Sequence, residues 1–206
     1  MYLRIVFLGA ILSCFADSVS AAPISYPVTI NTSNISGTVG SLDFNFNPGP
    51  LVTQAASLQI LSFSSNGTLT GSPSRVGNAS GTLPTTLTFD NGTGFNDYFQ
   101  GFTFGSTLSF TVSLFGPALS SPNGVSTSGS TFAFSMFSDA AGTKPVLTSD
   151  QINGFNFVVN VNLNGTTTAT SFLQTPEPGT GTLLLIGFSI AFVLARIRRW
   201  KPGFAL

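Results

Sequence analysis

The sequence predicts an all-β fold, an antiparallel β-sandwich of jelly-roll-like type. Between residues 22 and 172, apolar and polar residues alternate in many short segments, and turn dipeptides separate these segments. No helical periodicity there continues beyond two turns. Alternation with a period of two is typical of antiparallel strands with one buried and one solvated face. We expect eight or nine strands, as in sandwiches and jelly rolls.

The expected strands follow one another along residues 22–172. Their polar positions are mostly Ser, Thr and Asn, which suit a solvated sheet face without charge. Four Asn-Gly dipeptides are typical of hairpin turns: Asn66-Gly67, Asn91-Gly92, Asn123-Gly124 and Asn164-Gly165. The alternating segments are 26–30, 42–46, 56–63, 83–89, 102–104, 108–114, 132–136 and 155–163, with a last strand at 166–172.

Composition favours a folded domain and excludes nucleic acid as a partner. The 206-residue chain contains 21 Phe, enough apolar side-chain area for a core. Residues 22–175 contain two basic side chains, Arg75 and Lys144, and five Asp, a net charge of 2 − 5 = −3. Binding to phosphates requires clustered Lys and Arg, which two basic residues cannot form.

The same segment contains no His, Cys or Glu. General acid–base catalysis, nucleophilic triads and zinc sites depend on these residues, so none of them can be assembled here. Catalysis by a pair of aspartates is the one mechanism that remains, and the two carboxyl groups of such a pair must lie within about 5–10 Å of each other. Asp90 and Asp97 are the only near pair along the sequence. We therefore expect no enzymatic activity, no catalytic residue, no metal and no cofactor.

Three features are candidates for binding or modification sites. The loop from Asp90 to Asp97 could offer oxygen ligands to Ca²⁺, but Asp and Asn that cap their own backbone in a turn are the favoured interpretation. Tyr98 and Phe99 must point to opposite sheet faces, so one of them could be exposed to stack on a sugar ring. Asn-X-Ser/Thr sequons begin at residues 31, 34, 66, 78, 91 and 164.

The N-terminal 21 residues predict a secretory signal peptide. Arg4 precedes an apolar run of eight residues, 5–12, which is too short to span a bilayer. Small residues at 19–21 place cleavage between Ala21 and Ala22, and cleavage before Asp17 is an alternative. A third possibility is a lipoprotein signal that ends at Cys14, the only Cys of the chain.

The C-terminal segment predicts a linker, residues 173–181, and a membrane anchor with a basic tail, residues 182–206. The linker contains Pro176, Glu177 and Pro178. Residues 180–195 carry no charge and would form a helix about 24 Å long at about 1.5 Å per residue. That helix would be a short span, followed by Arg196, Arg198, Arg199 and Lys201, which stop transfer and keep the C-terminus cytoplasmic. The alternative is a buried helix of a soluble domain.

The order Pro-Glu-Pro, short apolar stretch, Arg-rich end resembles the PEP-CTERM sorting signal of Gram-negative bacteria. The matching residues are 175–180, 183–187 and 196–201. The resemblance implies an exported protein processed by the membrane protease-transpeptidase exosortase. Residues 93–105 and 108–114 also resemble a group of small PEP-CTERM proteins of unknown function, which supports a sandwich and implies no activity.

Two functions follow as expectations. The first is a non-catalytic structural protein of the cell surface or extracellular matrix. The second is an adhesin or polysaccharide-binding module. The expected partners are signal peptidase, exosortase, the inner membrane during processing, and in the second case an extracellular polysaccharide. The expected route is a single-pass stage in the inner membrane, then the cell surface or matrix.

Overall fold

A computed structural model describes residues 22–174 of the chain. The expected signal peptide, the Pro-Glu-Pro motif and the anchor with its basic tail lie outside the described residues. Within them, no helix is both long enough and apolar enough to cross a membrane. All strands and the whole apolar core described below lie within this segment, so it contains what an independently folding domain requires.

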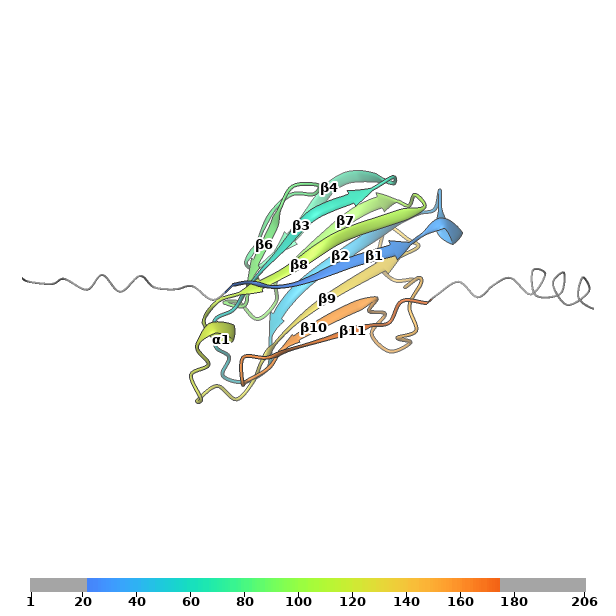
Figure 1. Cartoon of the computed structure of the whole chain (residues 1–206). Coiled ribbons are helices and arrows are strands. Elements are labelled where there is room, and N and C mark those ends of the chain that lie inside the picture. The colour runs from blue at the N-terminus through green and yellow to red at the C-terminus, as the bar shows by residue number, and fades with distance from the viewer. Residues whose placement is uncertain (1–21, 175–206) are drawn as a thin grey trace, which may run out of the picture.

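The described domain is all-β, as predicted, with two antiparallel sheets (Figure 1). It contains more strands than the expected eight or nine, because β4 and β5 lack clear alternation and were not predicted. The elements are β1 (Ile24–Asn31), a 3-10 turn η1 (Ser33–Ile35), β2 (Val39–Pro48), β3 (Ser57–Ser65), β4 (Thr68–Val76), β5 (Ala79–Gly81), β6 (Leu87–Asp90), β7 (Asp97–Thr103), β8 (Thr107–Phe115), α1 (Pro117–Ser120), β9 (Ser130–Phe137), β10 (Phe157–Val161) and β11 (Thr167–Ser171).

The chain passes repeatedly between the two sheets. One sheet has the strand order β1-β8-β3-β6-β5, and the other has β11-β10-β9-β2-β7-β4. From β1 to β5, and again from β6 to β9, each strand lies in the sheet opposite to its predecessor. The last three strands extend the second sheet beyond β2.

Aromatic side chains join the two sheets across the core. Phe110 of β8 lies 5.3 Å from Phe44 of β2 and 4.9 Å from Phe134 of β9, as ring-centroid distances. These contacts are edge-on, the arrangement that aromatic pairs prefer over direct stacking. Phe63 of β3 and Phe102 of β7, which lie in opposite sheets, make a similar edge-on contact. The predicted inward positions of β1, β2, β8 and β9 are all buried, apart from the partly buried Tyr26.

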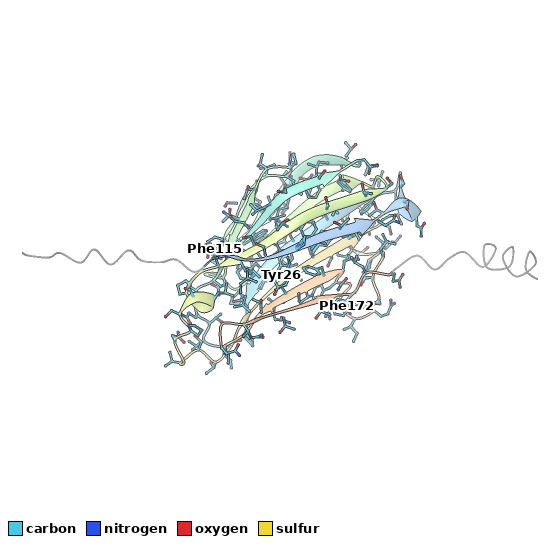
Figure 2. The ribbon with its side chains drawn as sticks, viewed as in Figure 1. Tyr26, Phe115 and Phe172 are labelled. Atoms are coloured by element: carbon cyan, nitrogen blue, oxygen red, sulfur yellow. The ribbon has the colours of Figure 1, made fainter. Side chains whose placement is uncertain are left out.

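Side chains close both open edges of the sandwich. On one side the Tyr26 hydroxyl of β1 hydrogen-bonds Thr167 of β11 at 2.6 Å (Figure 2 labels Tyr26). On the other, Arg75 of β4 donates to the carbonyl of Gly81 at 2.9 Å, and its guanidinium lies 5.5 Å from the ring of Tyr98. Exposed sheet edges invite pairing with other chains, and these bridges cover them partly.

The hairpin prediction holds for one of the four Asn-Gly dipeptides. Asn164-Gly165 joins β10 to β11, which pair with each other, and Gly165 has φ +80°, a value that favours glycine. By contrast, Asn66-Gly67 and Asn91-Gly92 join strands of different sheets. Asn123-Gly124 lies in the long connection from β8 to β9. A turn dipeptide reports a local reversal of the chain and not the identity of the paired strand.

Candidate functional site

The loop from Asp90 to Asp97 is held by hydrogen bonds to the protein itself. Asp90 Oδ1 accepts from the backbone N–H of Gly92 at 2.8 Å and from Asn78 Nδ2 at 2.6 Å. Asn96, fully buried, donates to the carbonyls of Phe46 and Thr93, both at 2.9 Å. These contacts support the turn-capping interpretation, since Asp90 Oδ1 and the Asn96 side chain hydrogen-bond to the backbone and side chains around the loop.

Asn91 in the same loop ties the two sheets together. Its Oδ1 accepts from the backbone N–H of Ala56, just before β3, at 2.9 Å. Its Nδ2 donates to the carbonyl of Gln54 at 2.8 Å and to Ser130 Oγ at the start of β9 at 2.7 Å. Asn91 is buried, whereas the Asn residues of the other five sequons are exposed. The folded domain therefore shields the side chain of this sequon.

The expected sugar-stacking aromatics are not a free surface. Tyr98 is fully buried, and its hydroxyl accepts from the N–H of Leu83 at 3.1 Å and donates to Gln100 Oε1 at 3.0 Å. Phe99 points to the outer face of the second sheet and is half-buried. Gly142 lies against it, and a Cβ on Gly142 would come within 2.8 Å of the ring. The loop after β9 therefore covers much of Phe99.

The most unusual electrostatic feature is a pair of carboxyls on this outer face. In the register of β2 with β7, Asn45 lies opposite Asp97 and Asp43 lies opposite Phe99, so Asp43 and Asp97 are diagonal neighbours. The Asp43 side chain hydrogen-bonds that of Asp97 and accepts from Asn45 Nδ2 at 3.3 Å. Its Oδ1 is buried and accepts no hydrogen bond from an amide or hydroxyl donor.

Burial, and then the neighbouring carboxyl of Asp97, raises the pKa of Asp43 to about 8. Asp43 therefore keeps its proton at neutral pH, which allows it to donate to Asp97. The sequence argument that Asp90 and Asp97 are the only near aspartates is wrong, because strand pairing joins Asp97 to Asp43 across 54 residues of chain. Within residues 22–174, no three His, Cys, Asp or Glu side chains gather where they could hold a metal.

The last strand leads directly to the C-terminal segment. Leu173 makes an isolated bridge with Thr148, and the N–H of Gln174 donates to the carbonyl of Leu147 at 3.1 Å. The described domain therefore continues two residues into the linker expected at 173–181. Gln174 is also the first residue of a segment that matches a protein-family model.

A family model described as the PEP-CTERM protein-sorting motif matches residues 174–199. The chain carries a PEP-CTERM sorting motif. The motif indicates an exosortase substrate that is exported and anchored in the membrane before processing. The match covers most of the predicted linker and of the predicted anchor, and Gln174 is the one described residue that it includes. Comparisons with curated proteins and with solved structures find no match.

Sequence reasoning missed the Asp43–Asp97 pair and the buried roles of Asn91 and Asn96. Asp43 occupies an outward position of a predicted strand, where an acid is expected to be solvated. Its partner depends on which strand lies beside β2, and alternation alone does not specify that neighbour. The available signal for the buried Asn residues was a Gly-containing loop with four Asp or Asn residues, which is equally typical of local capping.

Proposed function

We propose that this PEP-CTERM protein is a non-catalytic structural component of the cell surface or extracellular matrix, released or transferred there by exosortase. Its β domain is the cargo. The observation that carries the proposal is that the matched sorting motif begins at Gln174, which closely follows β11 and is the last residue that the structure describes. A motif that follows the domain directly in the sequence would be accessible to a membrane enzyme without unfolding of the cargo, which supports the proposal.

The side chains of the domain support a structural role. Its charged residues are five Asp, one Lys and one Arg, and two of the aspartates, Asp43 and Asp97, meet on the outer face of the second sheet. Asp43 and Asp97 do not line either of the two hollows near α1. A general acid must be within hydrogen-bond reach of its substrate. The pair lies between the paired strands β2 and β7, and this position gives no support to a catalytic role.

The same proposal includes the finer topology: a signal peptide cleaved between Ala21 and Ala22, a single span within 182–206, and a cytoplasmic C-terminus after Arg196. The apolar stretch and the following basic cluster are its support. The adhesin alternative loses its main sequence argument, since Tyr98 is buried and Phe99 is partly covered.

The test is the exchange Glu177→Ala in the full-length protein in its producing cell. We expect the variant to stay full-length in the inner-membrane fraction, whereas the parent loses its C-terminal segment and reaches the surface. Asp150→Asn, a change at a partly exposed loop position of the β domain, is the matched control and should be sorted like the parent. Normal surface delivery of the Glu177→Ala variant would contradict recognition at this motif.

The structural role is tested separately with the released protein on a glycan array. Uniform absence of binding is the expected result. Reproducible binding of one sugar class would replace the structural role with the polysaccharide-binding one.

A further inference from the structure

Five asparagines of the described domain are followed directly by glycine. Besides the four pairs expected in hairpins there is Asn153-Gly154, so the pairs begin at residues 66, 91, 123, 153 and 164. In such a pair the backbone nitrogen of the glycine can attack the side-chain amide carbon of the asparagine, because no Cβ obstructs the approach. The five pairs share this local chemistry, so differences in their reactivity must come from the tertiary structure.

The attacking nitrogen is hydrogen-bonded in four of the five pairs. The bonds, 2.8–3.2 Å long, run from the N–H of Gly67 to Ser65 Oγ, of Gly92 to Asp90 Oδ1, of Gly154 to the Asp150 carbonyl and of Gly165 to the Asn162 carbonyl. Within residues 22–174, the N–H of Gly124 donates no hydrogen bond. Gly124 is therefore the one glycine of the five whose nitrogen can react without first losing an acceptor.

The space around the glycines separates the same pair from the others. A Cβ placed on Gly67, Gly92, Gly154 or Gly165 would come within 2.5–2.8 Å of another atom, whereas one on Gly124 would meet nothing within 4 Å. Asn123 and Gly124 are both exposed, so water reaches them. Attack makes the planar amide carbon tetrahedral and moves the glycine nitrogen toward it, and the backbone at Gly124 has room for this movement.

The side chain of Asn123 is held over the chain that follows it. Its Oδ1 accepts from the N–H groups of Val125 and Ser126, both at 3.0 Å. Such a turn folds the side-chain amide toward the peptide that contains the Gly124 nitrogen. Two N–H donors on one oxygen also stabilise the negative charge that this oxygen gains when its carbon is attacked, as an oxyanion hole does. Within the described part of the chain, Asn123 Nδ2, the group that would leave, donates no hydrogen bond.

The loop of Asn123 is fixed against its neighbours at the α1 end of the domain. The N–H of Asn123 donates to Gln54 Oε1 at 2.8 Å. Gly165, in the β10–β11 turn, packs against Pro122. The loops of Gln54, Asn123 and Gly165 therefore meet at the end of the domain opposite Gln174 (Figure 1).

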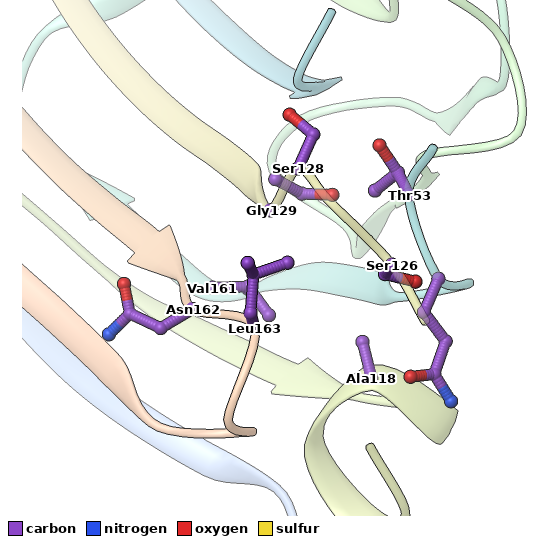
Figure 3. Close-up of a pocket in the computed structure, with 10 residues that line it drawn as sticks. Thr53, Ala118, Ser126, Ser128, Gly129, Val161, Asn162 and Leu163 are labelled. Atoms are coloured by element: carbon purple, nitrogen blue, oxygen red, sulfur yellow. The ribbon is translucent and has the colours of Figure 1, made fainter. Parts of the chain in front are cut away.

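Ser126, one of the two donors to Asn123, is also held by the domain. Together with Thr53 and Ala118 it lines a cavity of about 10 Å³ (Figure 3). The donors to Asn123 Oδ1 thus stay in place while the nitrogen of Gly124 remains open to solvent.

We propose that Asn123 is a site of spontaneous deamidation in the folded domain. The Gly124 nitrogen bonds to Cγ of Asn123, the Cγ–Nδ2 bond breaks, and the proton of the nitrogen passes through water to Nδ2, which leaves as ammonia. The product is a five-membered succinimide ring. Water then opens the ring at one of its two carbonyls. Opening at Cγ gives aspartate, and opening at the main-chain carbonyl gives isoaspartate. Water is the only co-reactant, and nothing is oxidised or reduced.

The reaction places a charge at an end of the domain that has none. The loops 49–56, 116–129 and 162–166 contain no Asp, Glu, Lys or Arg. Deamidation changes the net charge of the domain from 2 − 5 = −3 to 2 − 6 = −4. The inference depends only on the β domain, so it does not stand or fall with the proposed sorting.

The test follows residues 22–174 in mildly alkaline buffer, with peptide mass spectrometry that separates aspartate from isoaspartate. We expect Asn123 to convert at least about tenfold faster than each of the other four asparagines. Releasing a glycine N–H from its acceptor raises the barrier, and a tenfold difference in rate corresponds to about 1.4 kcal/mol. In guanidinium chloride the five should convert at similar rates, because the unfolded chain retains only the shared local sequence.

Two variants separate the site from the rest of the chain. Asn123→Gln must close a six-membered ring and should lose most of the gain in negative charge seen by ion-exchange chromatography. Asn164→Gln, at another exposed Asn-Gly pair, is the matched control and should gain charge like the parent. Equal thermal unfolding of both variants shows that folding is unaffected.

Three results would overturn the proposal. The first is an Asn123 that converts no faster than Asn164 in the folded domain, or that stays intact while the denatured chain converts. The second is a charge gain that persists in Asn123→Gln. The third is an equal preference for Asn123 in guanidinium chloride, which would assign the selection to local sequence and not to the fold.

Discussion

The buried Asp43 makes the stability of the β domain depend on pH in an unusual direction. In the unfolded chain its carboxyl ionises near pH 3.8, whereas burial and then Asp97 raise the pKa in the folded domain to about 8. Between these values the folded state holds a proton that the unfolded state releases. The free energy of unfolding therefore decreases as pH rises from about 4 to about 8, and this contribution becomes level above that range.

The size of the effect follows from the two pKa values. Their difference is about 4, and at about 1.4 kcal/mol for each pH unit the maximum loss of stability is about 6 kcal/mol. Asp43 retains some contact with solvent, which screens the charge, so we expect about 3 kcal/mol to be realised. Asp139 and Asp150 do not mask this window, because hydrogen bonds from Thr143 and from the Asn153 backbone, respectively, lower their pKa values below 3.8.

Replacing Asp43 by Asn removes the titrating group and keeps a donor for Asp97. We expect the free energy of unfolding of the Asp43→Asn variant in urea to change little between pH 4 and pH 8. At pH 8 it should be about 3 kcal/mol higher than that of the parent. The measurement is urea unfolding of residues 22–174 at several pH values, with unchanged slope m as the check on two-state behaviour. Asp150→Asn is the control and should keep the pH dependence of the parent. A parent whose stability is constant or rises from pH 5 to pH 8, or an Asp43→Asn variant that keeps the decline, would refute the buried-pair argument.

Two further substitutions test the hydrogen-bonded loops and the backbone. Asn91→Ala should lower the free energy of unfolding by about 3 kcal/mol in the same urea assay, because the buried N–H of Ala56 loses its acceptor. The control Asn164→Ala, at an exposed position, should change the free energy of unfolding by well under about 1 kcal/mol. Equal losses in the two variants would contradict the bridging role of Asn91. Ser62 sits at the β3 bulge with φ 54°, so Ser62→Gly should raise the free energy of unfolding by about 0.5–1 kcal/mol, and a lower value would show that the side chain matters more than the strain.

Much of the fold was predictable because the strongest signal in this sequence is alternation. The segments 26–30, 42–46, 108–114 and 132–136 each became strands with their apolar positions buried or partly buried. β4 was missed because its residues are mostly exposed and polar on both faces. Alternation reports a half-buried strand, and a strand with little buried surface does not display it.

The candidate site was predictable only where it is local. The turn-capping role of Asp90 needs a residue two positions away and could be inferred from the loop composition. Asn91 and Asn96 hydrogen-bond to chain segments more than 30 residues away. Asn91 accepts from the N–H of Ala56, and Asn96 donates to the carbonyl of Phe46. Such partners are set by which strands become neighbours, and that choice is made by the packing of the entire core.

The sequence by itself determined a charge-poor, Phe-rich all-β domain and a C-terminal PEP-CTERM motif, because composition, alternation and a contiguous motif are properties of neighbouring residues. The tertiary structure alone decided that Asp43 meets Asp97, that Tyr98 lies in the core, and that the loops of Gln54, Asn123 and Gly165 meet at the end opposite Gln174. These depend on strand order and register, which arise from long-range contacts between residues that the sequence keeps apart.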